Sequence, residues 1–214
     1  MTIWIDCLRH GDVIGGQKYR GITDDPVSNK GWQAMQAMTE KKSWQKIISS
    51  PLQRCAAFAH HYAQTSSTPL QLNHAFQEYN FGDWDGLTIN DIEQKGQQDL
   101  LHAFWDNPYN NPPPNAEAIT SFHHRVQQGW QELLTTTASK QQAHKIPATT
   151  QDKHLLLITH AGVIRALVSH VLAIPITHQM RIIIPLASMT SFRIDHYQQE
   201  QQELHVCLHY LGLT

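Results

Sequence analysis

Three short apolar segments, each leading into a helical pattern, constrain the fold of this 214-residue chain most strongly. They are Ile3–Leu8, Lys46–Ser50 and His154–Thr159. Short apolar runs bounded by polar residues are typical of buried strands, and strands that alternate with helices favour a parallel sheet covered on both faces. The sequence therefore predicts an α/β fold, a three-layer α/β/α sandwich with a mostly parallel central sheet.

Helix start signals lie between and after these segments. Ser28 is placed to cap a helix that follows it, and Thr88 with Asp91 forms a capping box for a helix that continues to Trp105. Asn115 is placed to cap a long helix with an apolar stripe. These signals predict helices between the strands, as the layered fold requires.

The last third of the chain predicts a connector and an outer part of the sheet. Residues 135–153 are polar and rich in threonine and glutamine, which indicates a frayed helix end followed by a mobile connector. The segments Ser188–Ile194 and Leu204–Tyr210 alternate in polarity, which is typical of strands with one face exposed. We expect a single domain over residues 1–214.

Composition and cysteine spacing exclude several classes of protein. With 16 basic and 18 acidic residues, the chain has no strong field to attract nucleic acid or an anionic membrane. Cys7, Cys55 and Cys207 lack the spacing of a disulfide framework or a zinc site, so free thiols in a reducing compartment are expected. The first predicted strand begins at once, without a basic region and a long apolar stretch before it, so a signal peptide is not expected. We expect a cytoplasmic protein with no nucleic-acid or membrane partner, and the oligomeric state stays open.

Basic side chains stand where three predicted strands end. Arg9 and His10 follow the first strand, Arg54 begins the helix after the second, and His160 follows the third. The carboxyl ends of parallel strands share one edge of a sheet, so these four side chains are expected to converge. Arginine forks and helix N-termini bind tetrahedral oxyanions. The pattern predicts a pocket for a phosphoryl group.

The residue types in this pocket suit metal-free phosphoryl transfer. His10 is the candidate nucleophile, because one nitrogen of a neutral imidazole can accept a phosphoryl group while the other is held by a hydrogen bond. Nearby arginines lower the pKa of such a histidine. Arg9, Arg54 and His160 are expected to stabilise the transferring oxygens. Glu78, in an aromatic-rich loop, is the candidate acid for the leaving oxygen and then the base for water.

Other polar and aromatic residues have structural interpretations. Glu117 is expected to be a favourable charge in the first turn of a helix, Arg165 a paired structural charge, and His123 a surface group. Glu78 has the alternative of a structural ion pair, and Trp84 is expected to line the pocket. The tryptophans expected in the core are Trp32, Trp44, Trp105 and Trp130.

Four segments together resemble the histidine phosphatase superfamily, in its phosphoglycerate-mutase-like branch. They are LRHG at residues 8–11, SSPLQRC around Arg54, FQEYNFGDWDG around Glu78 and LLLITHAGVIRAL around His160. The resemblance implies a phosphoglycerate-mutase-like sandwich, no metal or cofactor, and a phosphohistidine intermediate at His10. It implies that Glu78 is the proton donor. The substrate-binding residues that it implies are Arg9, Gly11, Arg20, Thr23, Arg54 and His160.

Within that branch, the forms RHGDV, FGDWDG and PNAEA are most similar to α-ribazole phosphatases of cobalamin assembly. This implies a phosphomonoesterase acting on α-ribazole 5′-phosphate or its cobamide-linked form. The alternatives are a broad-specificity sugar or nucleotide phosphatase, a phosphoglycerate mutase, and a non-catalytic module that binds a phosphorylated ligand. Val13 and Gly16 stand where relatives carry a hydroxyl residue and a phosphate-contacting asparagine. A backbone amide of Gly15–Gly16 is expected to replace the asparagine.

Overall fold

One sheet of six strands runs through the computed structural model, which describes residues 2–139, 152–196 and 204–214. The order of the strands across the sheet is β3-β2-β4-β1-β5-β6. Their bounds are β1 Thr2–Arg9, β2 Lys46–Ser49, β3 Leu70–Leu72, β4 Lys153–Thr159, β5 Met189–His196 and β6 Leu204–Leu213. Strands β1 to β4 pair in parallel, whereas β5 and β6 are antiparallel to their neighbours. The expected mostly parallel sheet is confirmed.

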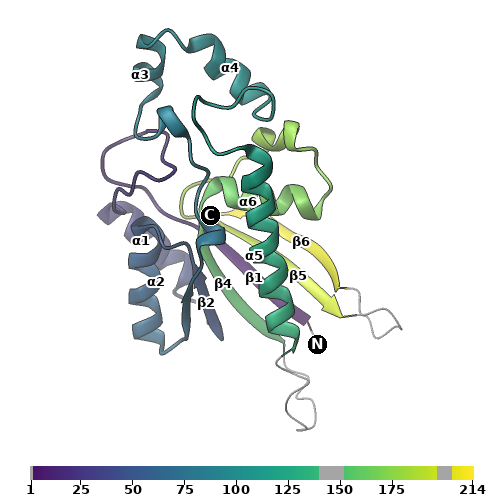
Figure 1. Ribbon diagram of the computed structural model, residues 1–214. Coiled ribbons are helices and arrows are strands. Elements are labelled where there is room, and N and C mark those ends of the chain that lie inside the picture. The colour runs from purple at the N-terminus through teal and green to yellow at the C-terminus, as the bar shows by residue number, and fades with distance from the viewer. Residues whose placement is uncertain (1, 140–151, 197–203) are drawn as a thin grey trace.

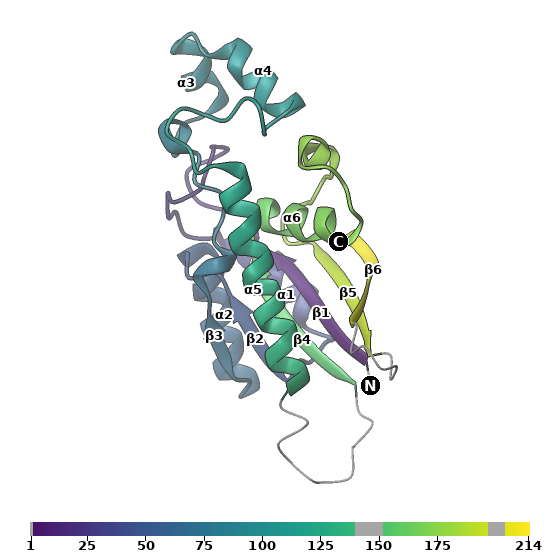
Figure 2. The ribbon, with the colours of Figure 1, turned by 45° about the vertical axis from the view of Figure 1, so that its right-hand side comes forward.

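Helices cover both faces of this sheet (Figures 1 and 2). The helices are α1 Asn29–Thr39, α2 Gln53–Ser66, α3 Ile89–Gln94, α4 Gln98–Asp106, α5 Ile119–Ser139 and α6 Ala161–Val171. The short 3₁₀ turns are η1 His74–Phe76, η2 Gly82–Trp84 and η3 Ile176–Arg181. Helices α1 and α2 pack on one face, and α5 and α6 pack on the other. None of the helices in the described part of the chain has the length and apolar character that crossing a membrane requires.

Strand β1 shows why the core forms on both sides of the sheet. Successive side chains of a strand point to opposite faces. Ile3 and Ile5 belong to the core under α5 and α6, whereas Leu8 packs with Met35 of α1 on the other face. All four side chains are fully buried. A continuous apolar run is therefore what a central parallel strand needs, and this is the pattern that the sequence carries.

The segment between β3 and α5 projects beyond the carboxyl ends of the parallel strands. Helices α3 and α4 form the far end of this projection, at the top of Figures 1 and 2. Phe104 and Trp105 of α4 line the same cleft as His10, which follows β1. The projection therefore forms one wall of a cleft whose floor is the edge of the sheet.

The helix signals have mixed outcomes. Ser28 caps α1 by accepting from the Gly31 amide, and Thr88 and Asp91 form the predicted capping box of α3. The prediction of one helix from there to Trp105 is wrong. Gly96 takes a left-handed φ of 71° between α3 and α4, a conformation that ends the first helix.

Two further predictions need correction or lie outside the described residues. Asn115 does not cap α5, which begins at Ile119; its side-chain amide instead donates to both carboxylate oxygens of Asp83. Helix α5 continues through the start of the predicted connector. The rest of that connector, residues 140–151, lies outside the described residues.

The cysteines and tryptophans largely follow the predictions. Cys7, Cys55 and Cys207 are free thiols, and the first two are buried. Trp44 and Trp130 are buried in the core, as expected.

Candidate active site

A cleft of about 410 Å³ at the carboxyl edge of the sheet gathers residues from distant parts of the chain. Arg9 and His10 come from the end of β1, Arg20 from the loop that follows, and Glu78 from the loop after η1. Arg165 of α6 completes this polar part of the lining. Four of the residues predicted from the sequence therefore lie in one cleft.

Two further predicted side chains, His160 and Arg54, are fully buried. The rings of His10 and His160 meet edge to face, with 5.3 Å between their centroids. His160 Nε2 lies 2.7 Å from the Ser50 hydroxyl at the end of the neighbouring strand β2. The strand ends thus bring the two histidines together as the sequence predicts.

Arg54 holds the loop that carries two predicted substrate contacts. Its Nη1 donates to the Thr23 carbonyl, and its Nη2 donates to the carbonyls of Arg20 and Gly21. The Asp85 carboxylate accepts from the amides of the same loop, including that of Thr23 at 2.7 Å. The backbone of this loop is therefore fixed, while substrate contact by Thr23 stays a prediction.

His10 is held with one ring nitrogen committed and the other available. Its Nδ1 lies 2.8 Å from the Gly11 carbonyl, which can only accept, so Nδ1 carries the proton and Nε2 the lone pair. Burial, followed by the charges of Arg9 and Arg54, lowers the pKa of His10 from 6.5 to about 3, and the hydrogen bond to Gly11 only partly opposes this shift. His10 is therefore a neutral imidazole at physiological pH.

Gly11 is needed for steric reasons. A Cβ at this position would collide with the backbone of Gly31 in the first turn of α1. Gly11 thus lets the end of β1 approach α1, and its carbonyl orients His10.

Two buried guanidinium nitrogens, on the arginines whose charges act on His10, lack a protein acceptor. Arg9 donates through Nη1 to the Ile184 carbonyl. Within the described part of the chain, Nε of Arg9 and Nε of Arg54 have no hydrogen-bond partner. Burial lowers the pKa of Arg9 to about 10, so this side chain remains cationic near neutrality. Unpaired buried donors are costly, and an oxyanion beside His10 would satisfy them.

The carboxylate of Glu78 is bound by two backbone amides. Oε1 accepts from its neighbour Tyr79 at 2.9 Å, and Oε2 accepts from Gly162 at 3.1 Å. A Cβ at Gly162 would collide with Oε1. Glycine at the start of α6 therefore allows the carboxylate to reach this position.

Arg125 positions the loop that carries Glu78, and sequence reasoning missed it. Its guanidinium forms a bidentate pair with Glu117, at 2.7 and 2.9 Å. It also donates to the carbonyls of Ala75, Gln77 and Glu78. Glu117 precedes α5 and is a partner in this clamp, so its prediction as a first-turn charge is wrong. The available signal was an arginine on the otherwise apolar face of the long helix.

Three other predictions are corrected here. Trp84 is fully buried and belongs to the core, whereas Trp105 is 44% exposed, lines the cleft and donates to the Tyr19 hydroxyl. His123 is buried and pairs with Gln179 at 2.7 Å. The sequence pattern around these rings does not show whether they face the core or the cleft, because that depends on how the projecting segment packs against the rest of the chain.

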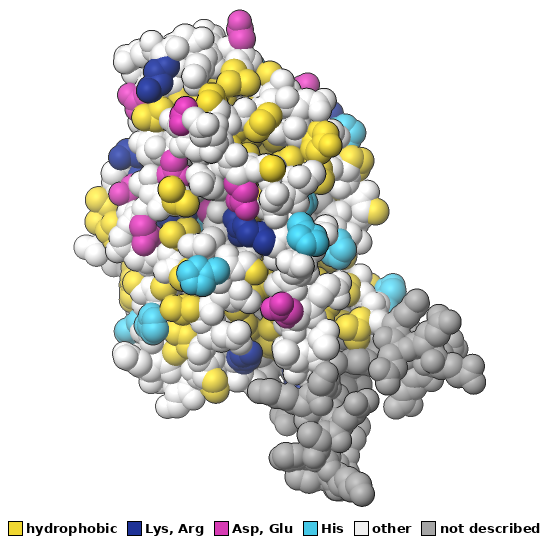
Figure 3. Space-filling model, viewed as in Figure 1, with side chains coloured by type: hydrophobic (Ala, Val, Ile, Leu, Met, Phe, Trp, Pro, Cys, Tyr) yellow, Lys and Arg dark blue, Asp and Glu magenta, His cyan; other side chains and the backbone are white. Residues whose placement is uncertain are grey.

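The histidines of the described residues do not gather at a metal site. Fifteen occur in the chain, and on the face shown in Figure 3 their side chains lie at several separate places. Across residues 2–139, 152–196 and 204–214, no group of three or more His, Cys, Asp or Glu side chains could hold a metal ion.

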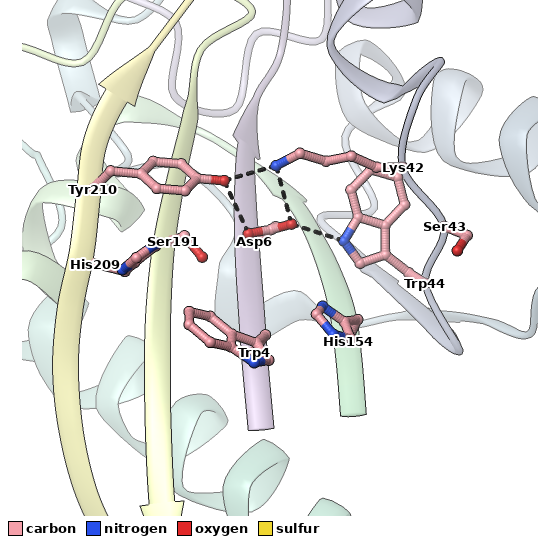
Figure 4. A pocket seen from close by; sticks show the side chains of 9 residues that line it. All are labelled: Trp4, Asp6, Lys42, Ser43, Trp44, His154, Ser191, His209 and Tyr210. Atoms are coloured by element: carbon pink, nitrogen blue, oxygen red, sulfur yellow. Dashed lines mark hydrogen bonds and ion pairs between the residues drawn. The ribbon is translucent and has the colours of Figure 1, made fainter. Parts of the chain in front are cut away.

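A second cavity, of about 420 Å³, lies on the α1 side of the sheet (Figure 4). Four of its polar side chains are paired with one another. Asp6 accepts from Trp44 Nε1 at 3.0 Å and from the Tyr210 hydroxyl at 3.2 Å, and Lys42 donates to that hydroxyl at 2.7 Å. The cleft of His10, with its unpaired donors, is therefore the candidate active site.

Comparison with known proteins decides the family. The sequence model of the histidine phosphatase superfamily (branch 1) matches residues 5–206. The chain belongs to this superfamily. The expected resemblance and the expected phosphoglycerate-mutase-like fold are confirmed.

Relatives within the histidine phosphatase superfamily carry several activities. The chain is 28% identical over 173 residues to a 2,3-bisphosphoglycerate-dependent phosphoglycerate mutase of Bartonella bacilliformis, covering 75% of this chain and 77% of that one. It is 22% identical over 202 residues to an adenosylcobalamin/alpha-ribazole phosphatase of Salmonella typhimurium, with 91% and 86% covered. A mycobacterial glucosyl-3-phosphoglycerate phosphatase has the same fold, with a TM-score of 0.83, 21% identity and both chains fully covered. Membership and the phosphatase-named relatives support a phosphoric monoester hydrolase.

The depressed pKa of His10 predicts an unusual titration. An ordinary imidazole is mostly protonated at about pH 5, but His10 should stay neutral there and gain a proton only near pH 3. Two-dimensional ¹H–¹⁵N NMR of the imidazoles, with His10 assigned by the spectrum of His10→Asn, measures this directly. At about pH 5 the His10 signals should show the Nδ1–H tautomer. Titration of His10 near 6.5 would contradict the described environment.

Proposed function

We propose that this protein is a cytoplasmic, metal-independent phosphomonoesterase that acts through phosphorylated His10. The single observation that carries the proposal is the state of His10: neutral, bonded through Nδ1 to Gly11, and next to two arginines with unpaired Nε atoms. A nucleophile with a free lone pair and an adjacent pair of oxyanion donors are what phosphoryl transfer requires without a metal.

In the first step, His10 Nε2 attacks phosphorus as the bond to the ester oxygen breaks. The new N–P bond places positive charge on the ring, and the Gly11 carbonyl stabilises it through Nδ1–H. Arg9 and Arg54 bind the equatorial oxygens, and His160 supports the pocket from behind. Protonated Glu78, in the same cleft, gives its proton to the leaving oxygen.

In the second step, water replaces the alcohol. The Glu78 carboxylate takes a proton from water as its oxygen attacks phosphorus, and the N–P bond breaks. Inorganic phosphate leaves, His10 is neutral again, and Glu78 is protonated for the next cycle.

A backbone contact takes the place of the asparagine that relatives carry. Gly15 and Gly16 both have left-handed φ values, 92° and 74°, and Gly16 lines the cleft. Backbone amides in glycine-rich turns can bind anions, so an amide of this pair is our candidate for the missing phosphate donor.

The preferred substrate is α-ribazole 5′-phosphate or its cobamide-linked form. Beyond His10 the cleft is walled by Tyr19, Phe81, Phe104 and Trp105, which suit an aromatic base on the leaving group. The Salmonella relative is named for this substrate. The second candidate is a broad-specificity sugar or nucleotide phosphatase, which the mycobacterial sugar-phosphatase fold and the open aromatic wall also favour.

The phosphoenzyme can be trapped. Brief exposure to a ³²P-labelled phosphoester followed by denaturing quench should leave acid-labile, alkali-stable phosphate on His10. His10→Ala should abolish the label and turnover, while the exposed His60→Ala should change neither. Undiminished turnover in His10→Ala would refute the mechanism, and tight binding without phosphate release would indicate a binding module.

The role of Glu78 predicts a dependence on the leaving group. Glu78→Gln should lower kcat/KM by about 10²–10⁴ for alkyl phosphates, whose alkoxide needs a proton. The same substitution should lower kcat/KM for 2,4-dinitrophenyl phosphate by less than about 10-fold, because the dinitrophenolate leaves without needing a proton. The exposed Glu132→Gln is the matched control. Equal losses on both substrates would remove Glu78 from the acid role.

A further inference from the structure

Arg165 is a cationic group in the cleft that the mechanism above does not use. It lies five residues after His160 on α6, and its side chain lines both the main cleft and a smaller chamber behind Glu78. Its Nε donates to the Ile182 carbonyl at 2.8 Å. Within residues 2–139, 152–196 and 204–214, its two terminal nitrogens donate to no protein group. The predicted pairing of Arg165 is therefore met at Nε, and its two terminal nitrogens are left for another acceptor.

Arg165 lies next to Glu78 in the cleft. Both residues line the main cleft and the smaller chamber, whereas Arg9 and His10 line only the main cleft. Burial lowers the pKa of Arg165, and the negative charge of Glu78 opposes that effect. Arg165 is thus placed on the Glu78 side of the cleft, where the proposed mechanism puts the leaving oxygen.

The chamber beside Arg165 is small and carries polar groups. It holds about 40 Å³, room for one small polar group and not for an aromatic ring. The Tyr79 hydroxyl in its wall is buried and has no partner among the described residues. Gln179, also in the wall, is fixed through its amide oxygen by His123. The chamber therefore has room for one oxygen-bearing group beside Arg165, and Arg165 also lines the main cleft, where a second oxygen can lie.

We propose that Arg165 is a specificity-determining residue that binds paired oxygen substituents of the leaving group, with the vicinal hydroxyls of a ribose as the first candidate. The inference rests on the proposed function, since it presumes an ester whose phosphoryl group lies at His10. A guanidinium fork binds two oxygens at once, which a neutral amide or a lysine does not do. A carboxylate next to the ester oxygen offers the same acceptor pair.

Matched substrates test the assignment. A nucleoside 5′-monophosphate and its 2′,3′-dideoxy analogue share the base, the phosphate and the leaving oxygen, and differ only in the two hydroxyls. The wild type should favour the diol in kcat/KM by about 10-fold to 100-fold, the usual worth of hydrogen bonds to a charged group. Arg165→Met should reduce that ratio to near one, leaving turnover of the dideoxy analogue within about 3-fold of wild type.

A second pair of substrates and two further variants show which oxygens Arg165 binds and whether its role is only structural. Glycerate 3-phosphate against glycerol 3-phosphate tests a carboxylate, and a preference lost in Arg165→Met assigns the residue to that group instead. Arg165→Lys should recover only part of either ratio, and Arg181→Met, at an exposed arginine nearby, should keep it.

Wild-type indifference within both substrate pairs would overturn the proposal. So would equal losses on both members of a pair in Arg165→Met, which indicate a structural role. Neither result bears on the phosphohistidine mechanism. That mechanism would be contradicted by a different result, the absence of labelled phosphoenzyme in the wild type.

Discussion

The hydrogen bond from His10 Nδ1 to the Gly11 carbonyl is the interaction on which the site depends. It selects the ring tautomer, so the lone pair lies on Nε2. It exists because Gly11 lets the end of β1 approach the backbone of α1 at Gly31, where any side chain would collide. The close contact between Gly11, which follows β1, and Gly31 of α1 thus fixes the orientation of the proposed nucleophile.

The buried charged side chains around this hydrogen bond are each paired with backbone carbonyls or amides. Arg54 is fully buried and stabilised by the carbonyls of the loop at residues 20–23, while Asp85 accepts the amides of the same loop. Arg125 and Glu117 do the equivalent for the loop that carries Glu78. Buried charges stripped of such partners would be strongly destabilising. Both loops are therefore fixed before a substrate arrives, as electrostatic preorganisation requires.

Most strands and helices, and the strand ends that carry the site residues, were predictable from the sequence because they follow from local patterns of apolar and polar residues. The apolar run at residues 154–159 and the shared edge of parallel strands were enough to bring His10 and His160 together. Contacts between loops were not predictable, because they depend on tertiary packing. No spacing rule shows that Arg54 donates to carbonyls some thirty residues earlier, or that Arg125 clamps Glu78. For the same reason Trp84 and Trp105 exchanged the environments expected for them.

The stereochemical course at phosphorus tests the covalent mechanism most directly. Hydrolysis of a phosphorothioate monoester made chiral with ¹⁷O and ¹⁸O can be followed by ³¹P NMR of the inorganic thiophosphate that it yields. Two in-line displacements, first by His10 Nε2 and then by water, predict overall retention of configuration. Inversion would mean that water attacks the ester directly, and would contradict a phosphohistidine at His10.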